Sequence, residues 1–290
     1  MSVRRVPTDD GVELALHRLR AHRDRRPALL LAHGAFANHR LWLHGSDEGR
    51  GGLAHFLGAA GFDVWLADLR HHGDAAREPR GARWTFEDWV LQDAPALVTR
   101  IQDETDGAAI AWVGHSAGGA AGLCWLARFS AASPLGAIVT FGTPGPNGVG
   151  PLRRILAATS VAVSRALGRF PARGFGFGSE DEAAGILAQW MGWNVRGGWI
   201  GADGFDYFAS LAAVRTPYLG VAGASDRVFA PPAACSQVVE RVGADRKSLL
   251  VEPGLSHRGL VLAPGARDGC WPRVAGWLKE TLTPGYIPAK

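Results

Sequence analysis

Short hydrophobic runs recur along this chain, and between them polar and apolar residues alternate with a helical period. Six runs have the length and the continuous apolar character of buried parallel strands, at residues 28–33, 62–68, 108–113, 136–142, 217–223 and 247–253. The first twenty residues add two strands joined by an Asp-Asp-Gly turn. Helical patterns fall between most of the strands, at residues 52–60, 85–104, 117–129, 232–242 and 272–282. The alternation predicts an α/β fold with a mostly parallel sheet.

One interval interrupts the alternation of strands and helices. Residues 147–215 contain no convincing strand, but they contain helical patterns at 152–167 and 180–191, joined by the link RGFGFGS. An insertion of this length is too long for a plain loop. We therefore expect a helical cap over the carboxyl edge of the sheet, where open α/β sheets bind ligands. Residues 1–146 and 216–290 would form the core domain.

Composition and charge exclude several classes of function. The net charge is +4 and the pI is about 9.3, but 28 of the 31 basic residues are arginines spread along the whole chain. This distribution lacks the dense basic stripe of a nucleic-acid-binding protein, so no nucleic-acid partner is expected. The arginine-rich amphipathic pattern at 152–167 is typical of helices on membranes. We expect its apolar face to pack on the sheet edge instead, which makes membrane contact unexpected.

Location and thiol state also follow from composition. No apolar run reaches the length of a membrane-spanning helix, and the first twenty residues have no signal-peptide core, so a cytoplasmic protein is expected. The three cysteines, Cys124, Cys235 and Cys270, have no metal-type spacing and are expected to be buried, reduced thiols. His71 and His72 are adjacent, but no third residue at a metal-like spacing accompanies them. No metal or other cofactor is predicted.

A candidate nucleophile lies in the segment AWVGHSAGGAAGLCW, residues 111–125. Its G-x-S-x-G match is weak by itself, because a chain with 39 glycines and 13 serines produces such matches by chance. The context is more specific, since Ser116 follows a buried strand and precedes a helix, as a nucleophile elbow requires. Gly114 and Gly118 would allow the strained turn, and the following small residues would let the helix approach the sheet. The alternative is a tightly packed strand–helix junction with an inert serine.

A nucleophilic serine needs a base and an acid that orients the base. Nine of the ten histidines lie at or before His115, and only His257 follows a later strand, the run at 247–253. Asp226 also comes just after a strand, which gives the chain order Ser…Asp…His. The alternative acids Glu252, Asp203, Asp206 and Asp245 lie in a strand body, the cap or an exposed loop. His115 is expected to pack within the elbow rather than to act as a second base.

An oxyanion hole needs two backbone N–H donors near the nucleophile. The elbow supplies the N–H of Ala117. The second donor should come from the turn that follows the run at 28–33, where Ala35 is favoured and Phe36 is the alternative. His33 and Gly34 would shape that turn.

Several segments together resemble the α/β-hydrolase superfamily. They are LLLAHGAFANHRLW, GFDVWLADLRHHGDA, GHSAGG, GASDRVFAPP and GLSHRG, and within them GFDVWLADLR and WVGHSAGG are similar to the acid-lipase-like branch and nearby bacterial esterases. The resemblance implies an eight-stranded sheet, a cap between the sixth and seventh strands, and a serine hydrolase without metal or organic cofactor. Two positions depart from the family pattern: His71 stands where relatives often have glycine, and Ala117 where they often have a larger residue. The departures predict an altered loop at the site mouth and more room beside the serine.

The cap is rich in aromatic residues, which could form a substrate pocket or simply its own core. Candidates for the pocket are Phe36, His115, Trp190, Trp193, Phe208 and Val228. The sequence thus predicts an esterase-like or lipase-like hydrolase for a small ester with an apolar acyl or alcohol part. An acyltransferase or polyester-related enzyme with the same acyl-enzyme, and a non-catalytic binder on the same fold, remain alternatives. Acyl length and oligomeric state are not encoded in any motif.

Overall fold

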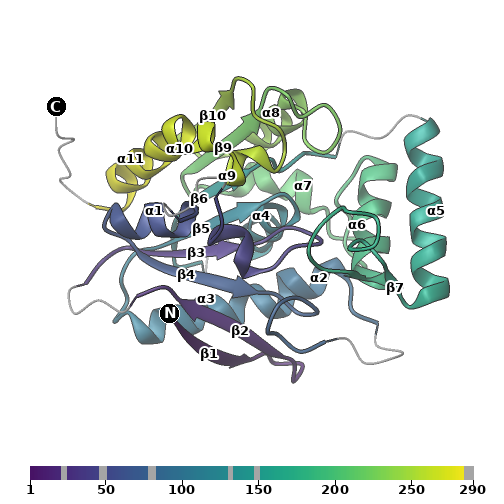
Figure 1. Ribbon diagram of the computed structural model, residues 1–290, viewed down its shortest axis with the longest axis horizontal. Coiled ribbons are helices and arrows are strands. Elements are labelled where there is room, and N and C mark those ends of the chain that lie inside the picture. The colour runs from purple at the N-terminus through teal and green to yellow at the C-terminus, as the bar shows by residue number, and fades with distance from the viewer. Residues whose placement is uncertain (21–24, 46–50, 78–82, 130–132, 147–150, 284–290) are drawn as a thin grey trace.

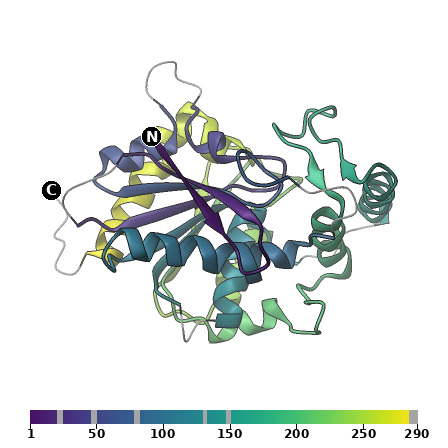
Figure 2. The ribbon, with the colours of Figure 1, turned by 90° about the horizontal axis from the view of Figure 1, so that it is seen from below.

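A central sheet of eight strands is covered by helices on both faces (Figures 1 and 2). The computed structural model describes the whole chain except residues 21–24, 46–50, 78–82, 130–132, 147–150 and 284–290. The strand order is β1-β2-β4-β3-β5-β6-β9-β10. The strands are β1 (Ser2–Pro7), β2 (Glu13–Arg18), β3 (Ala28–Ala32), β4 (Asp63–Asp68), β5 (Ile110–His115), β6 (Leu135–Phe141), β9 (Tyr218–Gly223) and β10 (Lys247–Glu252).

Most of the sheet is parallel, as the continuous apolar runs predicted. Only β2 pairs antiparallel, with β1 on one side and β4 on the other. Every other pairing in the sheet is parallel. The β1–β2 turn contains Gly11 at φ +82°, a backbone conformation that favours glycine. The carboxyl ends of the parallel strands therefore meet at a single edge of the sheet.

Two apolar cores lie on opposite faces of the sheet, because successive side chains of a strand point to opposite faces. In β5, Ile110 and Trp112 belong to one core, and Ala111 and Val113 belong to the other. The first core is covered by α3 (Ala94–Glu104), α4 (Ala117–Phe129) and α8 (Pro232–Arg241). The second is covered by α1 (Leu53–Ala59), α9 (Gly259–Leu262), α10 (Pro264–Asp268) and α11 (Cys270–Leu282).

The helical stretch predicted at 85–104 is divided into three parts. It consists of α2 (Phe86–Asp88), a π-helical turn (Trp89–Asp93) and α3. The carboxylate of Asp88 accepts the backbone N–H of Thr85 at 2.6 Å, which caps the start of this stretch. A short 3-10 helix, η1 (His39–Trp42), lies in the loop after β3.

The insertion between β6 and β9, described from residue 151 to residue 215, lies at one end of the sheet (Figures 1 and 2). It contains α5 (Pro151–Leu167), α6 (Ala184–Arg196), α7 (Tyr207–Ser210) and a 3-10 turn (Leu211–Ala213). The expectation of no strand there was wrong, since β7 (Arg169–Phe170) and β8 (Glu182–Ala183) form a two-stranded antiparallel sheet. Because β8 occupies the start of the second helical pattern, α6 begins at Ala184 rather than at 180. The proposed boundary at 147 lies outside the described residues.

Helix α5 does not pack as the sequence predicted. Its main contacts are with α6 and β7 inside the insertion, not with the sheet edge. Ile155, Leu156 and Leu167 are consequently exposed. No helix in the described part of the chain is long and apolar enough to cross a membrane. The three cysteines are free and buried, as expected.

Candidate active site

Ser116 occupies the sharp turn between β5 and α4, and its backbone φ is +52°. This left-handed conformation is costly for a residue with a side chain and is held by the surrounding structure. The Ser116 N–H donates to the carbonyl oxygen of Phe141 at 2.8 Å, and the Thr143 hydroxyl donates to the carbonyl oxygen of Ser116 at 2.8 Å. The turn is thereby fixed to β6 and to the loop that follows it.

Neighbouring glycines are required by close backbone contacts. A Cβ at Gly114 would collide with the backbone of Gly119, and a Cβ at Gly118 would collide with the carbonyl oxygen of His33. A Cβ at Gly122 would lie 2.5 Å from the indole nitrogen of Trp112, which donates to the carbonyl oxygen of Gly118. The small residues of this segment therefore serve the turn and the seating of α4 on the sheet.

His257 and Asp226 lie at the same edge of the sheet as Ser116, because each follows the carboxyl end of a parallel strand. His257 Nδ1 is 2.7 Å from Asp226 Oδ2, and the two side chains form an ion pair when the imidazole is protonated. Asp226 is buried, and its carboxylate also accepts the backbone N–H groups of Val228, Phe229 and Ala230. The acid is therefore fixed in position beneath the imidazole.

The surroundings shift the pKa values of Asp226 and His115. Burial alone would raise the pKa of Asp226, but hydrogen bonds from His257 and from backbone N–H groups lower it below the usual value. His115 behaves differently: burial and the neighbouring His257 lower its pKa to about 3. The neutral His115 ring donates from Nε2 to the carbonyl oxygen of His257 at 3.2 Å, with ring centroids 4.7 Å apart. His115 thus supports the His257 loop, in agreement with a packing role.

The turn after β3 is shaped by a buried histidine. His33 Nδ1 donates to the carbonyl oxygen of Gly34 at 2.8 Å, and its Nε2 accepts the backbone N–H of Leu69 at 3.2 Å. Burial and the nearby His72 lower the pKa of His33 to about 4, which keeps the ring neutral and able to accept. A Cβ at Gly34 would lie 2.9 Å from the carbonyl oxygen of His115. The turn after β3 is therefore in close contact with the backbone at His115 and Ser116.

The backbone N–H groups of the predicted oxyanion donors differ in their hydrogen bonds. Phe36, the alternative, has φ +64°, and its N–H points to Glu182 Oε2 at 3.4 Å. The N–H of Ala117 lies in the first turn of α4, where helix N–H groups have no intrahelical acceptor. In the described part of the chain, the N–H groups of Ala35 and Ala117 donate no hydrogen bond.

The insertion is attached to this turn by two glutamates. The Glu180 N–H donates to the carbonyl oxygen of Phe36 at 3.0 Å, and its carboxylate accepts from Asn38 at 2.6 Å and from Arg77 at 3.0 Å. Glu182 is fully buried and lies 3.3 Å from His72 Nε2. The insertion, the turn after β3 and the loop of residues 70–77 are thus linked.

His71 in that loop adopts φ +77°, a conformation that glycine accommodates without strain. His71, which stands where relatives often have glycine, therefore lies at a left-handed backbone position near the insertion. Ala117, the other departure, is 1% exposed within the first core and does not line the cavity described next. That a small residue there leaves more room beside the serine stays a prediction.

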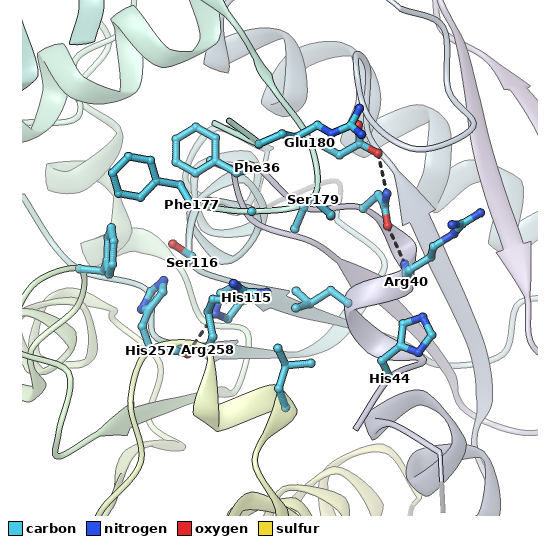
Figure 3. Close-up of a pocket in the computed structure, with 18 of the residues that line it drawn as sticks. Phe36, Arg40, His44, His115, Ser116, Phe177, Ser179, Glu180, His257 and Arg258 are labelled. Carbon is cyan, nitrogen blue, oxygen red and sulfur yellow. Dashed lines mark hydrogen bonds between the residues drawn. The ribbon is translucent and has the colours of Figure 1, made fainter. Parts of the chain in front are cut away.

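A cavity of about 540 Å³ opens beside Ser116 (Figure 3). Figure 3 shows Ser116 and His257 on one side of it, with Phe36 and Phe177 nearby. Among the residues predicted from the sequence, the cavity is lined by Ala35, Phe36, His115, Ser116, Trp190 and His257.

Three predicted pocket residues lie elsewhere. Trp193 is completely buried and donates its indole N–H to the carbonyl oxygen of Ile200 at 2.7 Å. Phe208 packs edge-on against Trp199, with ring centroids 5.4 Å apart. Val228 is 61% exposed. The aromatic pattern did not separate core residues from cavity residues, because both kinds recur at helical spacing.

Sequence reasoning missed several cavity residues. Phe229, one residue after Val228, has its ring centroid 5.1 Å from that of His257, and Phe177 comes from the glycine-rich link. Hydrophobicity in these two segments could have indicated them. The charged lining residues had no such signal, since exposed arginines occur throughout the chain.

One group of potential metal ligands was also missed. In the described residues, ligand atoms of His17, His39, Asp68 and Asp74 lie within 4.8 Å of one another. Asp68 Oδ2 is 3.0 Å from His17 Nε2 and 2.8 Å from His39 Nδ1, so both imidazoles already have an acceptor. None of the four lines the cavity beside Ser116. We assign this group a structural role in joining β2, β4 and η1.

Comparisons with known proteins agree with this geometry. A family model described as the alpha/beta hydrolase fold matches residues 27–175. Mouse lipase member N is 29% identical over 126 residues, and human lysosomal acid lipase/cholesteryl ester hydrolase is 28% identical over 126 residues. Each alignment covers 39% of this chain and 31% of the relative. The chain therefore matches about a third of the length of these curated relatives.

Solved structures resemble the chain over nearly its whole length. A thermophilic esterase from Thermogutta terrifontis has a TM-score of 0.69 at 16% identity, covering 98% of this chain and 100% of that one. A soluble variant of monoglyceride lipase from Saccharomyces cerevisiae has a TM-score of 0.70 at 14% identity, covering 98% and 97%. At these identities the likeness shows the fold, and the predicted fold is confirmed.

Proposed function

The chain belongs to the alpha/beta hydrolase fold family, and from this premise we propose that it is a serine hydrolase that cleaves carboxylic esters. One observation carries the proposal. A serine at φ +52° shares a cavity with a histidine whose Nδ1 is 2.7 Å from a buried carboxylate. The lipases among the relatives and the esterases of similar fold support ester hydrolysis in general.

The proposed reaction begins with proton transfer. His257 takes the hydroxyl proton of Ser116 as the serine oxygen attacks the ester carbonyl, which forms a tetrahedral intermediate. Asp226 holds the imidazole in one orientation and stabilises its protonated form. The protonated imidazole then gives the proton to the leaving alcohol, and an acyl-enzyme on Ser116 results. Water, deprotonated by His257, releases the acid and restores the serine.

The negative charge on the intermediate needs donors that are already oriented. We propose that the N–H groups of Ala35 and Ala117 bind it, each contributing about 3 kcal/mol to transition-state stabilisation. The buried, neutral His33 fixes the turn that carries the Ala35 N–H. Every step uses the chain's own groups, so the proposal requires no metal or organic cofactor.

We further propose that residues 147–215 act as a cap over the site and that the substrate is a small ester with an apolar part. The aromatic side chains of Phe36, Phe177, Trp190 and Phe229 at the cavity support this choice. A pocket of about 540 Å³ has the size of a site for small molecules.

The test combines labelling with substitution. We expect a fluorophosphonate probe to form an adduct at Ser116 in the folded protein. Hydrolysis of short para-nitrophenyl esters should fall by at least about a thousandfold in Ser116→Ala and in His257→Ala, because the nucleophile and its base act as a unit. Mass spectrometry of the labelled peptide and steady-state kinetics provide the two measurements.

Matched controls use a serine and a histidine that do not line the cavity. Ser236→Ala changes a half-buried serine of α8, and His55→Ala changes an exposed histidine of α1; both should retain turnover. Turnover that survives in Ser116→Ala would refute the proposed nucleophile. Preferential transfer of the acyl group to an added alcohol would identify an acyltransferase, and an intact fold without labelling would identify a binding protein.

A further inference from the structure

The cavity beside Ser116 has an unusual balance of charge. Four arginines line it, Arg40, Arg77, Arg173 and Arg258. Glu180 is the one carboxylate among the described lining residues. The cavity wall therefore carries an excess of positive charge, although the chemistry proposed above needs none of these arginines.

The carboxylate of Glu180 already accepts hydrogen bonds from other side chains of the protein. Glu180 Oε2 accepts from Arg77 at 3.0 Å, and Glu180 Oε1 accepts from Asn38 at 2.6 Å. The hydrogen bonds and positive charge around Glu180 lower its pKa even though burial alone would raise it, so it stays charged. The positive charge of Arg77 is thereby compensated by the carboxylate of Glu180. Arg40, Arg173 and Arg258, in contrast, form no ion pair with any described carboxylate.

Arg40 and the aromatic side chains lie at different ends of the wall, whereas Arg258 lies beside His257 (Figure 3). In Figure 3, Phe36 and Phe177 lie on the same side as Ser116 and His257, whereas Arg40 and His44 lie at the other end, beside η1. An apolar segment of a ligand would contact the rings near the serine. A group at the far end of that ligand would meet guanidinium and imidazole groups.

We infer that this site selects esters that carry an anionic group, a carboxylate or a phosphate, at the end away from the scissile bond. The inference rests on the proposed ester hydrolysis and narrows its substrate class. A guanidinium presents a planar fork of N–H donors that matches the oxygens of a carboxylate or phosphate. The positive wall also raises the local concentration of anions at the cavity mouth. Arg40 is the residue that we place at the anion.

The first experiment compares pairs of esters in which one member carries a carboxylate and the other a neutral group at the same position. Mono-para-nitrophenyl adipate has a free carboxylate at the end of its acyl chain, and para-nitrophenyl hexanoate is its neutral counterpart of equal length. Hexanoyl esters of para-hydroxybenzoate and para-hydroxybenzamide test an anion on the alcohol side. We expect kcat/KM to favour the anionic member of at least one pair by roughly tenfold. Added sodium chloride should weaken that preference, because exposed charges are screened.

The second experiment removes the positive charge of Arg40. Arg40→Gln should reduce the anionic-to-neutral ratio of kcat/KM by roughly fivefold to twentyfold, mainly through KM, and Arg40→Lys should restore part of it. Arg246→Gln is the matched control, because Arg246 is exposed, pairs with Glu280 and does not line the cavity. An unchanged ratio in Arg40→Gln and in the double variant with Arg173→Gln, or a preference for the neutral ester in both pairs, would overturn the inference.

Binding to an inactive variant separates this inference from the proposed reaction. In Ser116→Ala, calorimetry with the monobutyl amide of adipic acid and with N-butylhexanamide measures the preference without turnover. Tighter binding of the anionic amide, lost in Ser116→Ala/Arg40→Gln, supports the anion site even if no ester is cleaved. Equal binding of the two amides refutes the site even if Ser116 is labelled and neutral esters are hydrolysed.

Discussion

At the scale of single residues, the site depends on a strained backbone conformation at Ser116. A left-handed residue with a side chain costs of order 1–3 kcal/mol, and the structure around it must hold it there. Here the holding contacts are the hydrogen bonds from Ser116 to Phe141 and from Thr143 to Ser116. They work only because Gly114 and Gly118 let α4 and the turn after β3 approach closely. The glycines are therefore part of what holds Ser116 in this conformation.

A substitution at Gly118 tests this support. The new Cβ of Gly118→Ala would collide with the carbonyl oxygen of His33, so we expect the free energy of unfolding to fall by about 2 kcal/mol. Activity should fall as well, because the turn that carries Ala35 would be displaced. Urea denaturation and ester kinetics are the measurements.

The control is another helical glycine, Gly276 in α11, where an added Cβ would meet no atom within 4 Å. Gly276→Ala should raise the free energy of unfolding by about 0.5–1 kcal/mol, because alanine has the higher helix propensity. Equal effects of the two substitutions would show that backbone entropy, rather than the close contact, decides the outcome at Gly118.

At the scale of elements, strand β8 connects the insertion to the loops at the carboxyl edge of the main sheet. Burial alone would raise the pKa of Glu182 and lower that of His72. Their mutual attraction outweighs burial, so the pKa of Glu182 falls below its usual value and that of His72 rises above its usual value. His33 and His71 also face Glu182, and both have pKa values lowered to about 4. The buried charge pair is therefore Glu182 with His72.

Glu182→Gln should lower the free energy of unfolding by about 3 kcal/mol, because it leaves His72 buried without its partner. The loss should be largest between the unfolded pKa values of about 4.5 for glutamate and 6.5 for histidine, where both groups are charged in folded and unfolded chains. The pair's contribution declines as pH falls through the lowered pKa of Glu182 and as it rises through the raised pKa of His72. Urea denaturation across pH measures this profile.

Glu240→Gln provides the control, since Glu240 on α8 is exposed and accepts a single hydrogen bond, from Ser236. Its substitution should change the free energy of unfolding by less than about 0.5 kcal/mol at every pH. A pH-independent loss in Glu182→Gln would contradict the charged pair and indicate a simple loss of packing.

At the scale of the whole molecule, the insertion shares its core with the sheet. Trp193, Trp199 and Tyr207 belong to the same buried cluster as residues of α3, α4 and β5. The ring of Trp193 lies 5.2 Å from that of Phe86, which begins α2. The insertion has only a small cluster of its own, Phe170, Ala172 and Leu187, so it is expected to unfold together with the rest of the chain.

Trp193→Ala tests this shared core. We expect a loss of about 3–5 kcal/mol in the free energy of unfolding, because a large buried side chain is removed. Near-ultraviolet and far-ultraviolet circular dichroism should still report a single, coincident transition. Two separated transitions, with only the first shifted by the substitution, would instead show that the insertion folds independently.

Much of the fold was predictable because local pattern and tertiary burial agree in it. Six strands of the main sheet were indicated by apolar runs and β1 and β2 by the turn between them, and α4 spans the predicted 117–129. The short strands β7 and β8 were missed, because two residues carry no periodicity. In the site, Ser116, Asp226 and His257 were identified by order and by their position after strands, while their assignment as a triad stays a prediction.

The sequence by itself determined which residues reach the edge that carries Ser116, because each parallel strand brings its carboxyl end there and the next residues follow. Only the tertiary structure decided which aromatic side chains face the cavity. Trp190 lines it, whereas Trp193, one turn later on α6, lies in the shared core. Arg40 and Glu180 are 140 positions apart, and they meet at one cavity because the insertion folds back over the turn after β3. Such contacts depend on packing between distant segments, which no local pattern encodes.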